Sequence, residues 1–278
     1  MQGILLVGHG TQEAVGVREF LALAKQVADA RPQVAVEPCF LEIADPPIVA
    51  GVSRLVERGV EEIVVMPLLL FAAGHAKHDV PQSVTAALQP FPHISWAQAS
   101  HLGCHPAILQ QSSERFAEAV RDQARRRVSP RLARRLGEPP LRETSLVFVG
   151  RGSHDEQATQ EMHRFASLAP QSASVATVEV CFFAMAQPSL GETLKRVATA
   201  SFGRVIVQPH LLFDGLLLTG IRKCMAECAA KHQSTEWLVA DPLGPTAKVT
   251  QAVLERIDNA SQLFIPTRSV SEGIPGRA

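Results

Sequence analysis

Residues 63–81 have the sequence IVVMPLLLFAAGHAKHDVP, and the fold class follows from this pattern. The β-branched run at residues 63–66 predicts a strand that is covered on both faces, as in a parallel sheet. Pro67 ends the regular ladder of that strand, and an apolar loop leads on to Pro81, which favours the first turn of a helix. The ionisable side chains of this loop are His75, Lys77, His78 and Asp79. Because ligands of open α/β sheets bind beyond the carboxyl ends of the strands, we expect the functional site here.

The first half of the chain alternates between strand-like and helix-like patterns. We expect strands at residues 2–7, 34–41, 63–66 and 94–97. We expect helices at residues 14–30, 48–58, 80–88 and 107–127. This alternation predicts an α/β unit in which a parallel sheet is flanked by helices and joined by right-handed crossovers.

A second copy of this unit follows at a displacement of 142 positions. The matched blocks are VGHGT at 7–11 with VGRGS at 149–153, CFLEIADP at 39–46 with CFFAMAQP at 181–188, and PLLLF at 67–71 with PHLLF at 209–213. Three blocks that share one displacement indicate two tandem copies of the unit. We therefore predict two parallel sheets of the flavodoxin-like or Rossmann-like type in one chain.

The predicted domain organisation follows from the two copies. The predicted segments are an N-terminal repeat with the active site at 1–125, a basic and proline-containing linker at 126–144, a C-terminal repeat that lacks the ligands at 145–265, and a disordered tail at 266–278. The arginines of the linker suit a solvated helix end, and they also suit a basic edge that attracts a carboxylate-rich ligand.

Composition and charge exclude several classes of function. Lys plus Arg and Asp plus Glu number 27 each, so the bulk charge favours no nucleic-acid partner. No apolar run reaches the roughly 18 residues that span a bilayer, and no basic secretory segment precedes the first strand. We therefore expect a cytoplasmic protein without a membrane partner. The five cysteines are scattered and odd in number, which predicts no disulfide framework.

The two copies differ at ionisable positions near the strand ends. In the second copy, Arg151 replaces His9, Ala184 replaces Glu42, Gln187 replaces Asp45 and Leu217 replaces His75. Residues needed only for folding should be kept in both copies, so we expect the working site in the first. Two imidazoles and a carboxylate suit a borderline divalent ion such as Fe(II), Co(II), Ni(II) or Zn(II). The alternative is that each histidine is only a hydrogen-bonded loop residue.

Motifs of the first copy resemble those of the sirohydrochlorin chelatases of the CbiX/SirB type, which are class II chelatases. The motifs are GHGT at 8–11, EIADP at 42–46, PLLLF at 67–71, GH at 74–75 and DVP at 79–81. The resemblance implies a chelatase-like fold and a lyase that inserts Co²⁺ or Fe²⁺ into the tetrapyrrole sirohydrochlorin, with release of two protons. It implies a place in cobalamin or sirohaem biosynthesis, with the metal as substrate and without ATP or another nucleotide. Ni²⁺ is a further candidate, because ligand type does not separate these metals.

The resemblance also implies roles for individual residues. His9 would be a metal ligand and proton acceptor, His75 would be the second metal ligand, and Glu42 would assist with the metal or the protons. The residues expected to line the tetrapyrrole are Asp45, Leu69, Leu70, Phe71, Ala72, Ala73 and Gly74. Cations at the rim would pair with the carboxylates of sirohydrochlorin. The candidate rim cations are Lys77, Arg151, Arg222 and Lys223.

Other interpretations stay open. A non-catalytic carrier of metal or tetrapyrrole would use the same histidines without turnover. A phosphoryl-transfer enzyme is a remote alternative, because the glycine-rich turn at residues 8–11 could cradle phosphate, although no Gly-x-x-x-x-Gly-Lys-Ser/Thr loop occurs. In the second copy, His154, His210 and Asp214 could form an accessory metal site, or His210 could simply hydrogen-bond at a strand end. Because a duplicated chain supplies both halves of the fold, we expect a self-contained pseudo-dimer that is a monomer.

Overall fold

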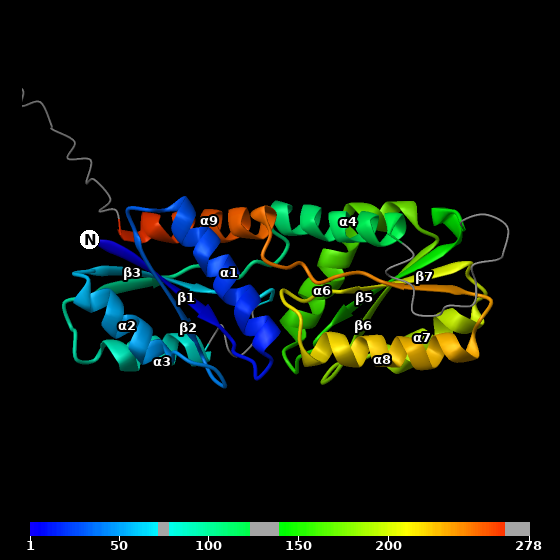
Figure 1. Cartoon of the computed structure of the whole chain (residues 1–278), viewed down its shortest axis with the longest axis horizontal. Helices are drawn as coiled ribbons and strands as arrows, with labels where there is room; N and C mark the ends of the chain where they lie inside the picture. Colours follow the sequence, from blue (N-terminus) through cyan, green and yellow to red (C-terminus); the bar gives the residue numbers. More distant parts are fainter. Residues whose placement is uncertain (72–77, 123–138, 265–278) are drawn as a thin grey trace, which may run out of the picture.

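The computed structural model describes residues 1–71, 78–122 and 139–264 and shows two parallel sheets flanked by helices (Figure 1). The first sheet has the order β2-β1-β3-β4 and contains β1 (Gln2–Gly8), β2 (Ala35–Phe40), β3 (Glu62–Pro67) and β4 (Ser95–Gln98). The second has the order β6-β5-β7-β8 and contains β5 (Thr144–Gly150), β6 (Thr177–Phe182), β7 (Arg204–Pro209) and β8 (Glu236–Val239). All neighbouring strands in both sheets pair in parallel. The predicted tandem α/β fold is confirmed.

The helices alternate with the strands. The first half contains α1 (Ala14–Ala30), α2 (Ile48–Glu57), α3 (Val80–Leu88) and α4 (Pro106–Arg121). The second half contains α6 (Glu156–Leu168), α7 (Leu190–Thr199), α8 (Leu216–Lys231) and α9 (Ala247–Ser261). Short 3₁₀ helices occur at Leu141–Glu143, Pro170–Ser174 and Gln262–Phe264.

The sequence explains where several helices begin. Ser189 and Glu192 form a capping box at the start of α7. The side chains of Asp155 and Thr246 accept backbone N–H groups in the first turns of α6 and α9. These contacts satisfy donors that a helix leaves unpaired at its first turn.

The exit loops of β2 and β6 have the same conformation. Each contains a cis peptide bond, at Asp45–Pro46 and at Gln187–Pro188. Ile43 and Met185, which are also 142 positions apart, have φ angles of 68° and 60°. The repeat in the sequence therefore corresponds to a repeat in local structure.

The last helix of each repeat covers the sheet of the other repeat. α4 packs against β7 and β8, whereas α9 packs against β3, β4 and α1, and the two helices also contact each other. Figure 1 shows α9 beside the first sheet and α4 beside the second. The sequence predicted a helix at residues 107–127 after the strands of the first repeat, and in the structure this helix covers the second sheet. The domain boundaries at 1–125 and 145–265 stay predictions about sequence units, because the packing crosses them.

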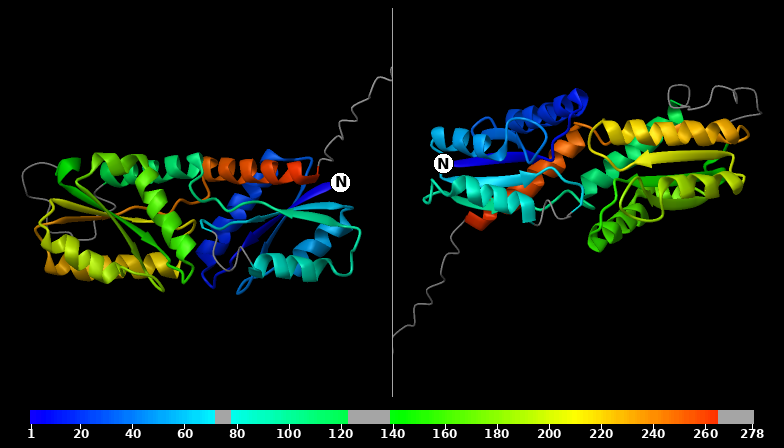
Figure 2. Two further views of the ribbon diagram at one scale, coloured as in Figure 1. Left: turned by 180° about the vertical axis from the view of Figure 1, so that it is seen from behind. Right: turned by 90° about the horizontal axis from the view of Figure 1, so that it is seen from below.

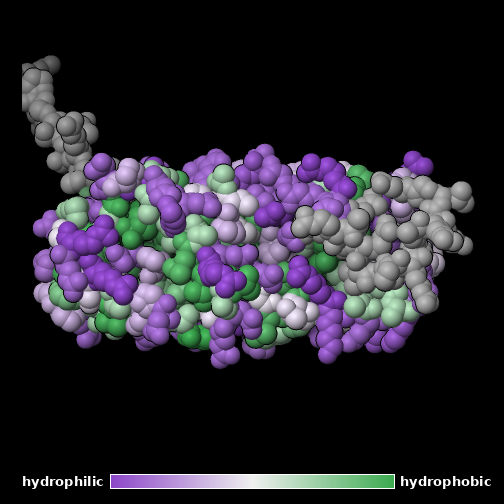
Figure 3. Space-filling view, viewed as in Figure 1, coloured by the Kyte–Doolittle hydropathy of each residue, from purple (hydrophilic) through white to green (hydrophobic). Residues whose placement is uncertain are grey.

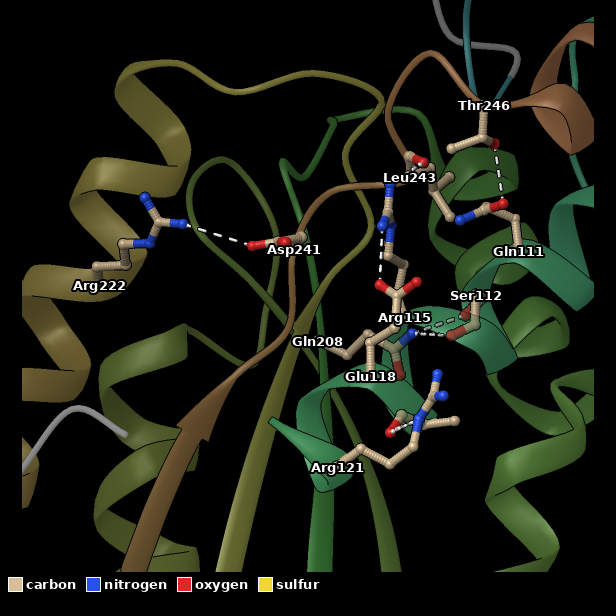
Figure 4. A network of polar contacts seen from close by, with 11 residues as sticks. Gln111, Ser112, Arg115, Glu118, Arg121, Gln208, Arg222, Asp241, Leu243 and Thr246 are labelled. Atoms are coloured by element: carbon tan, nitrogen blue, oxygen red, sulfur yellow. Dashed lines mark hydrogen bonds and ion pairs between the residues drawn. The ribbon is translucent and has the colours of Figure 1, made fainter. Parts of the chain in front are cut away.

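Polar contacts hold the exchanged helix α4 on the second repeat (Figure 4). Arg115 of α4 donates to the carbonyl oxygen of Leu243 at 3.0 Å. Gln208 of β7 donates through Nε2 to the carbonyl oxygen of Ser112 at 2.6 Å. Gln208 and Ser112 are both buried, so these hydrogen bonds fix the position of α4 in a site that water does not reach.

The hydrophobic core reflects the helix exchange. One cluster of buried side chains runs through both repeats and includes Leu6 and Val64 of the first sheet together with Phe148 and Ile206 of the second. Two further clusters lie beneath α2 and α3 and beneath α7 and α8. Hydrophilic residues cover much of the face seen in Figure 3, with smaller hydrophobic areas between them. In the described part of the chain, no helix is long and apolar enough to cross a membrane.

Candidate functional site

A cleft of about 830 Å³ lies where the two repeats meet, at the carboxyl ends of the strands. Strands of both sheets run toward this middle region of the molecule (Figure 2). The first repeat contributes residues 8–11 and 68–71 to the wall, and the second contributes residues 150–155 and 210–217. The cleft is therefore formed by the exit loops of β1, β3, β5 and β7, at the edge where a ligand is expected.

A close contact between two loops places His9 beside Glu42. Gly10 has a φ angle of 102°, and a Cβ atom at this position would collide with the carbonyl oxygen of Glu42. The N–H group of Glu42 donates to the carbonyl oxygen of His9 at 3.1 Å. A glycine after His9 thus allows the exit loop of β1 to lie directly against the exit loop of β2.

The imidazole of His9 has polar groups at both ring nitrogens. Nε2 lies 3.3 Å from Oε1 of Glu42 and 3.3 Å from a guanidinium nitrogen of Arg151. Nδ1 lies 3.3 Å from the carbonyl oxygen of Gly10, which can only accept a hydrogen bond. Nε2 thus has an acceptor, Glu42, and a donor, Arg151, at the same distance. In the tautomer that carries its proton on Nδ1, the Nε2 lone pair can accept a hydrogen bond from Arg151.

His9 and Glu42 have the separation of two ligands of one metal ion. Divalent ions bind imidazole nitrogen and carboxylate oxygen at about 2.0–2.2 Å, so two adjacent ligand atoms lie about 3.0–3.4 Å apart. The distance of 3.3 Å between Nε2 and Oε1 fits this arrangement. The side chains are 21% and 50% exposed, so an ion can reach them. Among the described residues, no group of three or more His, Cys, Asp and Glu side chains could hold a metal.

Part of the predicted site lies outside the described residues. This part contains His75, the predicted second metal ligand, and Lys77, a predicted rim cation. It also contains Ala72, Ala73 and Gly74, which were predicted to line the tetrapyrrole. The roles of these five residues stay predictions.

The described part of the predicted substrate loop lines the cleft. Leu69, Leu70 and Phe71 all lie in its wall. Backbone N–H groups in the exit loop of β4 donate to the carbonyl oxygens of Leu69 and Leu70, at 2.9 and 2.7 Å, which fixes this part of the wall. Asp45 is exposed and is not among the residues that line the cleft, and its predicted role in substrate binding is untested.

The predicted rim cations have different surroundings. Arg151 lies in the wall of the cleft. Arg222 lies 3.9 Å from a carboxylate oxygen of Asp214 and 3.8 Å from one of Asp241, and Figure 4 shows the contact with Asp241. Lys223 is exposed on α8 and does not line the cleft. Of these three arginine and lysine side chains, Arg151 is therefore the one positioned to meet a ligand in the cleft.

Most of the wall that the second repeat contributes was not predicted from the sequence. His210 belongs to this wall, and its ring lies 4.8 Å from that of Phe71 and 4.1 Å from that of Phe165. Burial lowers the pKa of His210 to about 3. Its Nε2 has no hydrogen-bond partner in the described part of the chain, so the predicted hydrogen bond at a strand end is not found for this atom. The signal in the sequence was the PHLLF block, which places His210 directly after a strand of the second copy.

The accessory metal site that was considered for the second repeat is not formed. His154, His210 and Asp214 all lie in the wall of the cleft. Within residues 139–264, however, they do not belong to any group of three metal-ligating side chains. That interpretation was wrong, because one cleft wall holds these side chains without bringing them to a common point.

The sequence and the fold were compared with known proteins. The sequence model of the CbiX family matches residues 3–119 and 145–260. The sirohydrochlorin cobaltochelatase of Priestia megaterium is 26% identical over 93% of this chain and 79% of its own length, and the sirohydrochlorin ferrochelatase of that organism is 28% identical over 88% and 85%. The structure of SirB from Bacillus subtilis with Fe³⁺ has a TM-score of 0.77 and 25% identity, over 93% of this chain and 95% of SirB. Both repeats of the chain match one family model, and the chain therefore belongs to the CbiX family.

Proposed function

We propose that this protein is a sirohydrochlorin chelatase, a lyase that inserts Co²⁺ or Fe²⁺ into sirohydrochlorin and releases two protons without using ATP. The observation that carries the proposal is the pairing of His9 Nε2 with Glu42 Oε1 at 3.3 Å, where His9 lines a largely apolar cleft, in a member of the CbiX family. The similar chelatases of Priestia megaterium, named for cobalt and for iron, support both metals. The proposal includes a cytoplasmic, monomeric protein that supplies both sides of the cleft.

The metal is a substrate that the protein must hold briefly and then release. His9 and Glu42 would hold it through one nitrogen and one oxygen, and two protein ligands leave most coordination positions open for ring nitrogens. His75, which the resemblance implies as the second metal ligand, would complete the set. Because the protein supplies only a few ligands, of both nitrogen and oxygen type, the four ring nitrogens can replace them. Such a site favours transfer of the metal to the ring over storage of the metal in the protein.

The same side chains can take up the protons that leave the ring. A neutral imidazole accepts a proton near neutral pH, and a neighbouring carboxylate stabilises the imidazolium that results. Nδ1 of His9 is held by the carbonyl oxygen of Gly10, so the proton would arrive at Nε2, beside Glu42, once the metal has left that nitrogen. Proton transfer by a positioned group typically contributes about 10²–10⁴-fold to a rate.

The apolar wall suits the face of a large macrocycle. Leu69, Leu70 and Phe71 from the first repeat line the cleft together with Met162 and Phe213 from the second. Such a wall excludes water from the ring face and leaves the charged edge of the ring near the opening. Asp45 and residues 72–74 would extend this surface.

The experiment that tests the proposal is anaerobic metallation of sirohydrochlorin, followed by absorbance, with Co²⁺, Fe²⁺ and Ni²⁺ in parallel. We expect multiple turnovers by the wild-type protein, and a loss of about 10²-fold or more in His9→Ala. His93→Ala is the matched control, because His93 is an exposed histidine outside the cleft. Binding without turnover would favour the carrier, and a wild-type rate in His9→Ala would refute the site.

A further inference from the structure

Arg151 occupies the position in the second repeat that His9 occupies in the first. Both lie between two glycines directly after a strand, 142 positions apart. Gly152 has a φ angle of 93°, and a Cβ atom there would collide with the carbonyl oxygen of Ala184. The N–H group of Ala184 donates to the carbonyl oxygen of Arg151 at 2.9 Å. The loop that carries Arg151 is thus as firmly placed as the loop that carries His9.

The side chain of Arg151 reaches across the cleft to the first repeat. Ala184 stands where the first repeat has Glu42, so its own repeat offers Arg151 no carboxylate at that position. In the described part of the chain, no carboxylate forms an ion pair with Arg151. Its guanidinium instead lies 3.3 Å from Nε2 of His9. The cation therefore lies beside the lone pair that a metal ion would use.

Arg151 and a metal ion cannot use this lone pair together. A guanidinium has only donors and stays protonated, so its contact with a neutral imidazole consumes the imidazole lone pair. A metal ion bound at Nε2 would also bring a second positive charge next to the guanidinium. The metal can therefore bind His9 fully only when Arg151 has turned away.

A carboxylate is a better partner for Arg151 than the imidazole is. Arginine binds carboxylates through two parallel hydrogen bonds that are assisted by charge, and such pairs are stronger than a single bond to a neutral acceptor. The side chain of Arg151 is exposed, so it is free to change its rotamer. A ligand that brings carboxylates to the rim of the cleft would draw Arg151 away from His9.

We propose that Arg151 couples the two substrates of this site by covering the His9 lone pair until a carboxylate of the tetrapyrrole takes the guanidinium. The inference rests on the proposed function, because it assigns the carboxylates to sirohydrochlorin. A metal ion that enters before the macrocycle finds Nε2 of His9 in contact with Arg151. A metal ion that enters after the macrocycle finds Nε2 accessible. Since coupling between two ligands is reciprocal, bound macrocycle should strengthen metal binding and bound metal should strengthen macrocycle binding.

The test is Co²⁺ binding by the metal-free full-length protein without any tetrapyrrole, measured by calorimetry and by the visible absorption of bound Co²⁺. We expect Arg151→Gln to bind Co²⁺ about tenfold more tightly than the wild type, since coupling factors are typically about 5–150-fold. We also expect its KM for sirohydrochlorin to rise more than its kcat changes. Arg164→Gln is the matched control, because Arg164 is an exposed arginine of α6 outside the cleft wall, and it should change neither quantity.

The outcomes separate this inference from the proposed function. Unchanged or weaker Co²⁺ binding in Arg151→Gln overturns the inference, provided that His9→Ala lowers Co²⁺ binding. Wild-type Co²⁺ binding in His9→Ala overturns the metal site itself, and the inference with it. Arg151→Lys keeps the positive charge but lacks the planar guanidinium that binds a carboxylate through two hydrogen bonds. It should therefore still compete in part with the metal for His9, and its affinity for the macrocycle should fall.

Discussion

His210 gives the protein a dependence on pH that a single substitution should remove. The residue is 4% exposed, and its ring stacks on Phe71 with 4.8 Å between the ring centroids and an angle of 27° between the ring planes. The ring of Phe165 lies on it at 4.1 Å. His210→Phe keeps an aromatic ring in this position and removes the buried Nε2, which has no partner among the described residues.

The structure gives the expected size of the effect at neutral pH. A buried polar atom without a hydrogen bond costs about 1–3 kcal/mol, and phenylalanine avoids this cost. We therefore expect His210→Phe to have a free energy of unfolding at least as large as that of the wild type at pH 7.5. His210→Ala should instead lose about 3 kcal/mol, because it leaves a cavity beside Phe71 and Phe165.

The effect should grow as the pH falls. Burial lowers the pKa of His210 from 6.5 to about 3 in the folded protein. Between these two values, the unfolded chain binds a proton that the folded protein does not bind, so the free energy of unfolding falls as the pH falls. This single group should remove about 2.5 kcal/mol between pH 7.5 and pH 4.5, at about 1.4 kcal/mol per unit over most of that range. His210→Phe lacks this loss.

Urea unfolding at pH 7.5 and pH 4.5 measures the difference directly. The wild type should lose about 2.5 kcal/mol more than His210→Phe over this range. The control His93→Ala should follow the wild type, because His93 is exposed. If the wild type and His210→Phe lose the same amount, His210 accepts a proton in the folded protein, and the buried placement of its ring against two phenylalanines is refuted.

Three further outcomes are expected. Gly10→Ala should abolish Co²⁺ binding and lower the thermal unfolding midpoint by more than Gly59→Ala does. Gly59 is the control, because it also has a positive φ angle but no atom lies near its Cβ position. Equal effects of the two substitutions would contradict the role given to the contact between the loops. Glu236→Gln should lower the free energy of unfolding by about 3–5 kcal/mol, since it leaves the buried Arg204 without its charged partner at 2.7 Å, and urea unfolding checks this. Burial raises the pKa of Cys39 to about 12, so a thiol reagent at pH 8 should modify Cys39 only after unfolding, which peptide mass mapping detects.

The sequence predicted the sheets well because each strand carries its own signal. The buried run at residues 63–66 lies within β3, and the displacement of 142 positions maps β1 onto β5 and β3 onto β7. The exchange of α4 and α9 has no such signal. The two sheets are copies of each other, so the apolar face of α4 suits either one. The hydrophobic pattern of α4 therefore does not predict which sheet the helix covers. The choice depends on contacts such as that of Arg115 with Leu243, which join distant parts of the chain.

The candidate site was also predicted in part from the sequence. Strand ends and the comparison of the two copies identified His9 and Glu42, and the structure brings their side chains to 3.3 Å. The metal-binding roles stay predictions, as does that of His75. From the sequence, Arg151 was predicted only as a rim cation, although it aligns with His9 and Ala184 replaces the carboxylate of Glu42. Its contact with His9 could not be predicted, because it depends on how the two repeats face each other.

The helix exchange is what fixes that arrangement. α4 leaves the first repeat to cover β7 and β8, and α9 returns to cover β3 and β4, so the repeats cannot separate without exposing the apolar faces of both helices. The two walls of the cleft are therefore held at a set distance. A contact of 3.3 Å between Arg151 and His9 requires this, because the two residues come from different sheets. With the walls held in place, rotation of the Arg151 side chain would remove its contact with His9, and we expect a ligand carboxylate at the rim to drive that rotation.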